Sequence, residues 1–325
     1  MVLGMNSKIL LTDLAAAAGC SAAQASRAVN GKPNVAPEIR ARVLAAARQL
    51  NYRNTAIRHI PNIAIIKHGT VRMYSGEVIG AIEDCLQSLK WRWQIFDISS
   101  TENINEFFYD GIISVSSAKG IAQNIPRLMN FPLVVINDYG LAMENICSID
   151  PDTFEESRLV LEHLTGLGHK KILRIKYVSD NNSPYLLRGD KEYFAAAKLY
   201  NVELSVGNVI YYNGESLEKI VSNAIADGYT AIFMIHQYFA VAISSVLQKL
   251  KVQIPQEISL VTYEVPEVTK FLHPPHTTVA FEYHELARIA IEQLKRRMKG
   301  ESTAVKFNCP VKLLVRDSTG PAPGR

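Results

Sequence analysis

The hydrophobic positions of the first fifty residues follow a helical period in three short segments. A first apolar stripe runs from Leu11 to Ala18 and ends at Gly19. Ser21 can cap a second helix over residues 22–29, before an Asn-Gly pair suited to a left-handed turn. A third helix begins at Pro37, and its apolar residues repeat at helical spacing: Ile39, Val43, Ala46 and Leu50. The pattern predicts three helices around one small core.

From Ile63 onward, short apolar strands alternate with amphipathic helices. The predicted strands are Ile63–Ile66, Trp93–Ile98, Gly111–Val115, Leu133–Ile136, Ile172–Tyr177, Val209–Tyr212, Ala231–Ile235 and Ser259–Thr262. The predicted helices are Val78–Leu89, Phe154–Leu167, Lys191–Leu199, Leu217–Asp227, Ala240–Leu250 and His284–Met298. Such alternation is typical of parallel sheets covered by helices on both faces. We therefore expect a small all-α head and an α/β body of two doubly wound lobes.

Charge separates these two parts of the 325-residue chain. Residues 1–60 hold eight Lys or Arg and two acids, a balance of +6, whereas the rest holds 27 basic and 29 acidic side chains, a balance of −2. A basic head on a nearly neutral body indicates that the head alone has a polyanionic partner.

Helix, glycine turn and a second, polar helix form the arrangement that places the second helix in a DNA major groove. On that helix Gln24 and Arg27 can reach base edges, while Ser21, Ser26 and Asn30 suit phosphates. The alternative is an alanine-rich three-helix bundle whose basic face is merely solvated.

Residues 11–52 closely resemble the DNA-binding head of the lactose-repressor (LacI/GalR) family. The matching motifs are Asp13-Leu14-Ala15, Ala18-Gly19-Cys20-Ser21, the run from Gln24 to Asn30, and the run from Val35 to Tyr52. Ala22 and Ala23 stand where the family often has large polar base readers, so they could touch only a thymine methyl group. The resemblance implies a helix-turn-helix domain over residues 1–53, with its motif at 11–30.

A hinge segment follows the head in that family, and residues 54–60 are its counterpart here. By resemblance Ile60 is the residue that wedges into the minor groove, and Arg58 is a phosphate or minor-groove contact. Plain linker is the alternative, because Pro61 and a strand follow at once. The candidate DNA-binding residues are Leu11, Thr12, Ser21, Ala22, Ala23, Gln24, Ser26, Arg27, Asn30, Asn54, Arg58 and Ile60.

The body carries further landmarks of the same family, whose body is similar to periplasmic sugar-binding proteins. They are Asp110-Gly111-Ile112-Ile113, Gly168-His169-Lys170-Lys171-Ile172, Ile254-Pro255-Gln256-Glu257-Ile258-Ser259, and Pro274-Pro275-His276-Thr277-Thr278. The resemblance implies an effector-binding domain at 61–321, with one lobe at about 61–155 and 282–308 and the other at about 156–281 and 309–321. The stretch before Asp110 is short, so a helix and part of a strand could be missing there. That feature resembles the evolved-β-galactosidase repressor branch.

Effector contacts are expected where open sheets leave a crevice, at the carboxyl ends of strands. Arg188 resembles the family's effector arginine, whose planar fork can hold two vicinal hydroxyls. The other candidates by resemblance are Asn137, Asp138, His236, Gln237, Tyr263 and Glu264. For each, an ordinary surface or capping role is the alternative.

Other chemistry finds little support in the sequence. No dinucleotide or phosphate-binding glycine loop and no nucleophile motif occurs, so we expect neither an enzyme nor a cofactor. A metal site at His273, His276 and His284 is disfavoured, because His273 and His276 flank a Pro-Pro pair that resembles an ordinary loop of the family, and Glu155-Glu156 are interpreted as solvated charge on a helix. The four cysteines fit no zinc or redox spacing.

Together these patterns predict a homodimeric transcription repressor that binds double-stranded operator DNA and a small effector, for which we expect a sugar such as a galactoside. No apolar run approaches a membrane span and the first residues lack the zones of a signal peptide, so we expect a cytoplasmic protein without membrane contact. The rival interpretations are a soluble sugar-binding protein without DNA function and an enzyme of the doubly wound class.

Overall fold

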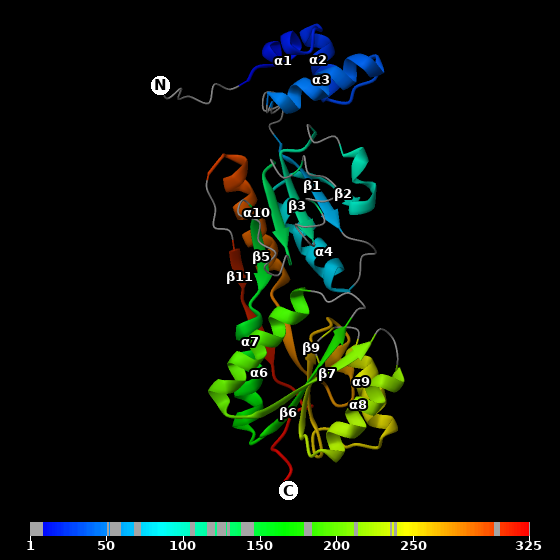
Figure 1. The fold of residues 1–325 in the computed structure, drawn as a ribbon, viewed down its shortest axis with the longest axis vertical. Coiled ribbons are helices and arrows are strands. Elements are labelled where there is room, and N and C mark those ends of the chain that lie inside the picture. Colours follow the sequence, from blue (N-terminus) through cyan, green and yellow to red (C-terminus); the bar gives the residue numbers. More distant parts are fainter. Residues whose placement is uncertain are drawn as a thin grey trace.

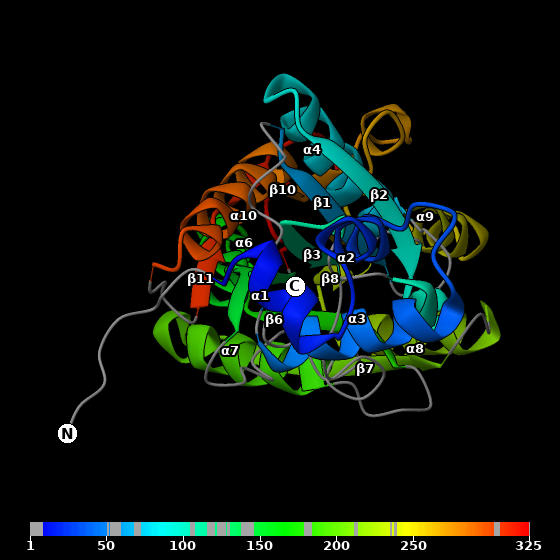
Figure 2. The ribbon, with the colours of Figure 1, turned by 90° about the horizontal axis from the view of Figure 1, so that it is seen from above.

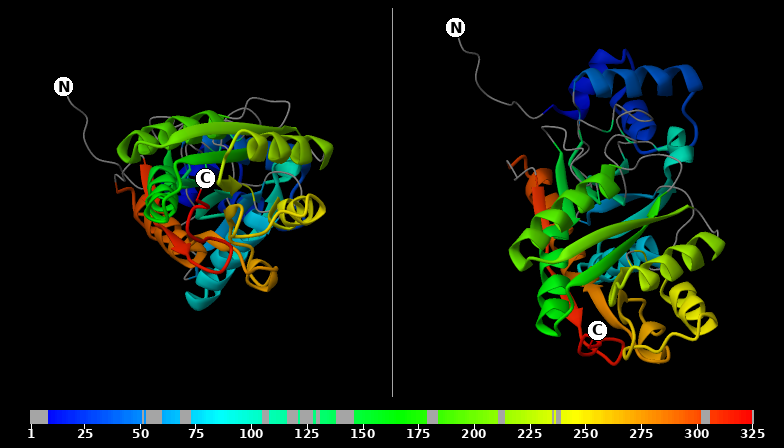
Figure 3. Two further views of the ribbon diagram at one scale, coloured as in Figure 1. Left: turned by 90° about the horizontal axis from the view of Figure 1, so that it is seen from below. Right: turned by 60° about the horizontal axis from the view of Figure 1, so that its bottom comes forward.

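The chain folds into a head and two lobes stacked along one axis, as a computed structural model shows (Figure 1). It describes residues 9–50, 52, 60–67, 73–104, 108–115, 121, 128, 131–137, 146–178, 184–210, 214–234, 236, 239–301 and 306–324. The head lies at one end, and the C-terminal segment lies at the opposite end, beyond the second lobe (Figure 3).

The head consists of α1 (Leu11–Ala17), α2 (Ala22–Val29) and α3 (Pro37–Gln49). Asp13 caps α1, since its Oδ2 accepts a hydrogen bond of 2.8 Å from the Leu10 amide. The three helices share one core, in which Leu14, Ala25 and Val43 are fully buried. The three helices expected from the apolar periodicity are therefore present.

The first lobe is built on a parallel six-stranded sheet of order β11-β5-β4-β3-β1-β2. Its strands are β1 (Asn62–Lys67), β2 (Arg92–Asp97), β3 (Gly111–Val115), β4 (Leu133–Ile136), β5 (Cys147–Pro151) and β11 (Lys306–Cys309). The helices α4 (Met73–Ser88) and α10 (Tyr283–Met298) cover one face with a shared apolar core. A second core on the other face includes the short 3-10 helix η1 (Ile98–Asn103) through Ile98.

The second lobe has a six-stranded sheet of order β12-β10-β9-β8-β6-β7, in which only β12 runs antiparallel to its neighbour. Its strands are β6 (Lys171–Val178), β7 (Glu203–Ile210), β8 (Ala231–Met234), β9 (Ser259–Tyr263), β10 (Thr277–Phe281) and β12 (Val311–Leu314). The helices α6 (Thr153–Gly166) and α7 (Pro184–Tyr200) pack on one face, and α8 (Gly214–Ala226) and α9 (Phe239–Lys249) on the other.

The chain passes between the lobes after β5, after β10 and between β11 and β12. Because β5 leaves the first sheet toward the second lobe and β10 leaves the second sheet toward the first, the carboxyl ends of the two sets of parallel strands face one another. We call this region the interlobe boundary.

The fold class expected from the sequence is confirmed, but the strand list was incomplete. The strands β5, β10, β11 and β12 have only four or five residues each, and they were not recognised. The shortened stretch keeps a complete β2, paired with β1 along six residues, and the 3-10 helix η1 stands in its connection to β3. The shortening therefore falls on the connection and leaves the strand whole.

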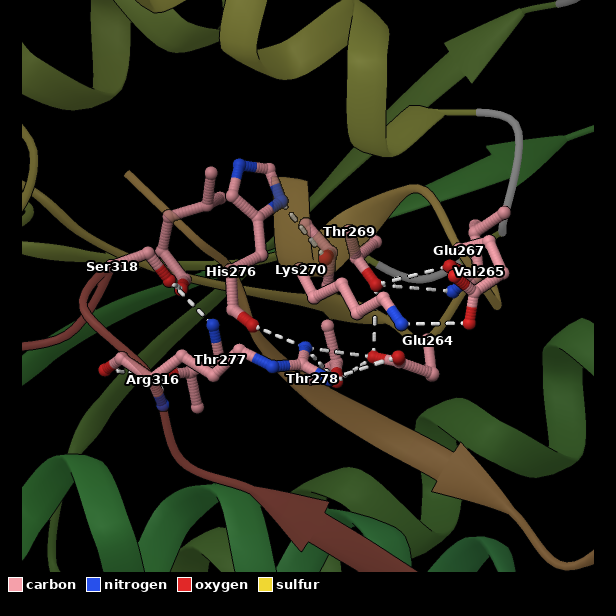
Figure 4. A network of polar contacts seen from close by, with 12 residues as sticks. Glu264, Val265, Glu267, Thr269, Lys270, His276, Thr277, Thr278, Arg316 and Ser318 are labelled. Carbon is pink, nitrogen blue, oxygen red and sulfur yellow. Dashed lines mark hydrogen bonds and ion pairs between the residues drawn. The ribbon is translucent and has the colours of Figure 1, made fainter. Parts of the chain in front are cut away.

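The C-terminal segment 315–320 closes the second lobe by polar contacts (Figure 4). Arg316 reaches across to Glu264, with Nη1–Oε2 and Nη2–Oε1 distances of 2.8 and 2.9 Å. Ser318 Oγ donates to the Leu260 carbonyl at 2.6 Å and accepts from the Thr277 amide at 2.7 Å. The last residues of the body thus fasten β9 to β10.

Glu264 is mostly buried, with 15% of its side chain exposed. Burial alone would raise the pKa of its carboxyl group, but hydrogen bonds from Arg316, Thr278 and Thr269 outweigh burial and lower the pKa. A carboxylate stabilised in this way contributes to folding above its ordinary pKa of 4.5, and the contribution is lost as the pH falls through the lowered value.

We expect Arg316→Ala to lower the free energy of unfolding of the body by about 2 to 4 kcal/mol at pH 7, since Glu264 is left buried without its partner. The deficit should shrink as the pH falls and Glu264 takes up a proton. Urea unfolding at pH 7 and pH 4 measures both effects. Arg288→Ala is the matched control, because Arg288 pairs with Glu285 while 59% of its side chain is exposed, and a loss as large as that of Arg316→Ala would contradict the prediction.

The head should depend strongly on Leu14, which is fully buried among its three helices. We expect Leu14→Ala to destabilise the head by about 2 to 4 kcal/mol through the cavity it leaves, enough to unfold a domain of this size. Leu10→Ala, at a side chain 55% exposed, serves as the control. Amide exchange of the head in the full-length chain measures both variants, and equal protection in the two would contradict the prediction.

Candidate functional site

The outer face of α2 is exposed, while its inner face forms the core of the head. Ser21, Ala22, Ala23 and Arg27 are exposed, whereas Ala25, Ala28 and Val29 are buried. The helix therefore presents a continuous surface with one long cationic side chain, Arg27, as a DNA-reading helix requires.

Three of the predicted DNA contacts, Ser21, Gln24 and Asn30, form hydrogen bonds within the head. Gln24 Oε1 accepts from the Ser21 amide at 3.0 Å, and Ser21 Oγ accepts from the Gln24 amide at 3.2 Å, which completes a capping box at the start of α2. At the other end Asn30 Nδ2 donates to the Ser26 carbonyl at 2.7 Å. These bonds fix both ends of α2.

The flanking candidates are described only in part. Thr12 is exposed and Leu11 is half-buried at the start of α1, and Ile60 is 42% exposed just before the body begins. Asn54 and Arg58 lie outside the described residues.

At the interlobe boundary the first lobe contributes Asn137, directly after β4. Its Oδ1 accepts a hydrogen bond of 2.8 Å from the Tyr74 hydroxyl, near the start of α4. Asn137 has a φ of 62°, in the left-handed region that few non-glycine residues adopt. Such strained positions occur often at functional sites. Asp138 lies outside the described residues.

A cluster of aromatic rings continues from Tyr74 across the boundary. The Tyr74 ring lies edge-on to Phe281 and Tyr283, with centroid distances of 5.5 and 5.7 Å. Phe281 in turn lies edge-on to Tyr263, at 5.1 Å. The cluster thus joins α4 of the first lobe to β9 of the second through the crossing at residues 281–283.

Two further candidates, His236 and Arg188, belong to the second lobe. His236 follows β8 with a φ of 115°, and its ring lies 5.6 Å from that of Phe239. Arg188 belongs to the first half of α7, but its side chain lies outside the described part, as does Gln237.

Tyr263 ends β9 and Glu264 follows it, and both side chains form hydrogen bonds inside the second lobe. The Tyr263 side chain is buried and its hydroxyl lies 3.0 Å from each carboxylate oxygen of Glu156, while Glu264 is held by Arg316 as described above. An effector would have to compete with these partners to reach either polar group.

One expectation was wrong. Glu156 was expected to be solvated charge on a helix, together with Glu155. It is 1% exposed, and burial raises the pKa of its carboxyl group to about 7, even though Arg174 and the hydrogen bond from Tyr263 favour the charged form. Glu155, by contrast, pairs with Arg158 at 2.6 Å near the surface.

The sequence interpretation also missed a buried ionic cluster between β6 and α7. Arg174 and Lys176 are almost fully buried, and both bind the carboxylate of Asp190. The Arg174 guanidinium also lies 5.0 Å from the centre of the Tyr193 ring. Two cations two residues apart in an otherwise apolar strand were the available signal, because residues at that spacing point to the same face of a sheet.

No group of three or more His, Cys, Asp or Glu residues that could hold a metal ion occurs in the part of the chain that the structure describes. His276 is buried, with Nε2 2.8 Å from Ser244 Oγ and Nδ1 3.1 Å from Thr262 Oγ1. Burial and the charge of Arg316 lower its pKa to about 4, so its ring is neutral at pH 7. His273 and His284 are exposed.

The helices of the described segments are too short or too polar to cross a membrane. All four cysteines are free, two of them buried.

Two family models match this chain. The model for bacterial regulatory proteins of the lacI family matches residues 10–54, and the model for a periplasmic binding protein-like domain matches residues 161–319. The first covers α1 to α3, and the second covers most of the second lobe together with α10, β11 and β12.

Curated relatives match along nearly the whole chain. The ribose operon repressor of Haemophilus influenzae is 25% identical over 311 residues, which are 89% of this chain and 92% of that protein. The sucrose operon repressor of Streptococcus mutans is 26% identical over 328 residues, with 95% and 98% covered.

Solved structures share the same fold. A lac repressor dimer bound to operator and the anti-inducer ONPF matches with a TM-score of 0.69 at 18% identity, covering 97% of this chain and all of that chain. A complex of the transcriptional regulator CelR with cellobiose matches with a TM-score of 0.66 at 19% identity, with 95% and 99% covered. With a head that matches the lacI family of bacterial regulatory proteins and a two-lobed body similar to periplasmic binding proteins, the chain has the domain organisation of a DNA-binding transcriptional regulator.

Proposed function

We propose that this regulator is a repressor whose affinity for an operator is controlled by a small sugar-like effector bound between the two lobes. The observation that carries the proposal is α2: a capped helix on a basic head, with Ser21, Ala22, Ala23 and Arg27 exposed together. The candidate DNA contacts are those of α2 with Leu11, Thr12, Asn54, Arg58 and Ile60.

The effector-binding domain in this proposal spans residues 61–321. One lobe comprises about 61–155 and 282–308, and the other about 156–281 and 309–321. The candidate contacts are Asn137, Asp138, Arg188, His236, Gln237, Tyr263 and Glu264. The left-handed backbone of Asn137 and His236 at two strand ends supports this placement, because strained residues concentrate at ligand sites.

A sugar effector is supported by the names of the relatives, which include repressors of ribose and sucrose operons and a regulator bound to cellobiose. Because the short stretch before Asp110 resembles the evolved-β-galactosidase repressor branch, a galactoside is the first ligand to test. We further propose that the protein acts in the cytoplasm as a homodimer, with two heads in successive major grooves.

Retention of genomic fragments on a filter tests the DNA-binding half of the proposal. Fragments of the genome that encodes the protein should be retained in the presence of excess competitor DNA, and retention should weaken with salt as counterions return to the phosphates. A free sugar-binding protein would retain none of them.

We expect Arg27→Ala to weaken binding to a retained fragment by about 1 to 3 kcal/mol and to relax the preference at one base pair. Binding titrations against single-base variants of the fragment measure both. Arg288→Ala removes an equal charge from an exposed site in α10, so it controls for net charge. A loss that is uniform over all variants would make Arg27 a phosphate contact instead.

We expect Arg188→Ala to leave DNA binding intact and to abolish the response to effector. Thermal-shift screening of the wild-type protein against a sugar panel identifies the effector, since a ligand that prefers the folded form raises the melting temperature. The same sugar should then release DNA from the wild-type protein but not from the variant. Unchanged release would remove Arg188 from the site.

A further inference from the structure

The head touches the first lobe at the residue that follows the DNA-reading helix. Gly31 has a φ of 59°, and a Cβ atom added there would lie 2.6 Å from Phe108 Cε2 and nearer still to Cζ. The Phe108 ring therefore lies against the backbone of Gly31. From above, the connection between α2 and α3 passes over the first lobe (Figure 2).

Phe108 is anchored in the lobe on its own side of the contact. It packs against the apolar core that contains Ala64 and Ile66 of β1. Its carbonyl accepts a hydrogen bond of 3.0 Å from Asn62 Nδ2, and the neighbouring Asp110 exchanges bonds of 2.8 Å with the backbone of Asn62. Asn62 is the first residue of β1, and β1 pairs with β3. These hydrogen bonds therefore hold the segment that carries Phe108 against the first sheet.

The turn on the head side is equally constrained. The Lys32 amide donates to the Arg27 carbonyl at 2.9 Å, and the Gly31 amide to the Ala28 carbonyl at 3.2 Å. Arg40 of α3 donates to the Lys32 carbonyl at 2.6 Å and to the Ala28 carbonyl at 3.4 Å. A displacement at Gly31 is therefore passed to α2 and α3 together.

We propose that Phe108 is a positioning residue for DNA binding, which seats the head on the first lobe and sets the direction of α2. The seat is a second attachment beside the covalent connection through residues 53–61, and two attachments restrict rotation where a single tether would not. The contact leaves Ser21, Ala22, Ala23 and Arg27 exposed, so it presents the reading surface and does not cover it. This inference rests on the proposed function for its effect on DNA, but the seat itself can be tested without DNA.

The chain offers a matched pair of glycines for the test. Gly19 has nearly the same φ, 60°, but nothing lies within 4 Å of a Cβ added there. Alanine at either position meets the same backbone strain, whereas only Gly31→Ala collides with Phe108. The difference between the two variants isolates the contact.

The contact between Phe108 and the head is tested by nitrogen-15 transverse relaxation of backbone amides in the full-length protein. In the wild type, the transverse relaxation rates of head amides should equal those of body amides, because the two tumble as one unit. In Phe108→Ala and in Gly31→Ala the head amides should relax more slowly than the body, whereas Gly19→Ala should behave as the wild type does. Body amide shifts that stay in place show that each variant is folded. A head that tumbles independently in the wild type, or that is unaffected by both variants, overturns the proposal.

The effect on DNA is tested with a fragment retained by the wild type in the filter assay. Phe108→Ala and Gly31→Ala should each weaken binding by about 3- to 10-fold, since the free head must be ordered on binding. In the double variant the two losses should not add, because both remove the same contact. Losses that multiply, or a loss in Gly19→Ala as large as that in Gly31→Ala, contradict the proposal. If the wild type retains no fragment, the proposed function fails, and the relaxation result still decides the seat.

Discussion

The order in which the strands of the two sheets follow one another along the chain is the constraint on which the rest of the structure depends. Each lobe needs strands from distant parts of the sequence: β11 completes the first sheet and β12 the second, after β1 to β10 are already in place. The crossings at 151–153, 281–283 and 309–311 therefore lie together at the interlobe boundary. Ligands of open α/β sheets bind beside the carboxyl ends of strands, and here two such edges meet where the described chain crosses between the lobes.

Helical periodicity and continuous apolar runs were informative. The three helices of the head and the strands Gly111–Val115 and Leu133–Ile136 could be read directly from the sequence. The strands β5, β10, β11 and β12 could not, because segments such as CSIDP and KFNC mix polar with apolar residues and contain no continuous apolar run. Their pairing is set by partners far along the chain.

The candidate sites divide in the same way. Exposure of Arg27 and of the alanines on α2 follows from the helical period alone. The partners of Glu156, Tyr263 and Glu264 do not, since α6, β9 and the C-terminal segment meet only in three dimensions. Phe108 was equally invisible, because it lies in a connection and its contact crosses between domains. The family resemblance gave the positions of candidate effector-binding residues. It did not show which of their side chains form hydrogen bonds within the folded protein.

The fastening of β9 to β10 by Arg316 and Ser318 has a consequence for synthesis. The head needs nothing beyond Tyr52 for its core and can fold while the rest of the chain is still being made. The contacts of Arg316 and Ser318 cannot form until residues 315–320 have left the ribosome, so Glu264 stays without its counter-charge until then. A nascent chain would therefore carry a folded head while the polar contacts between β9 and β10 have still to be made.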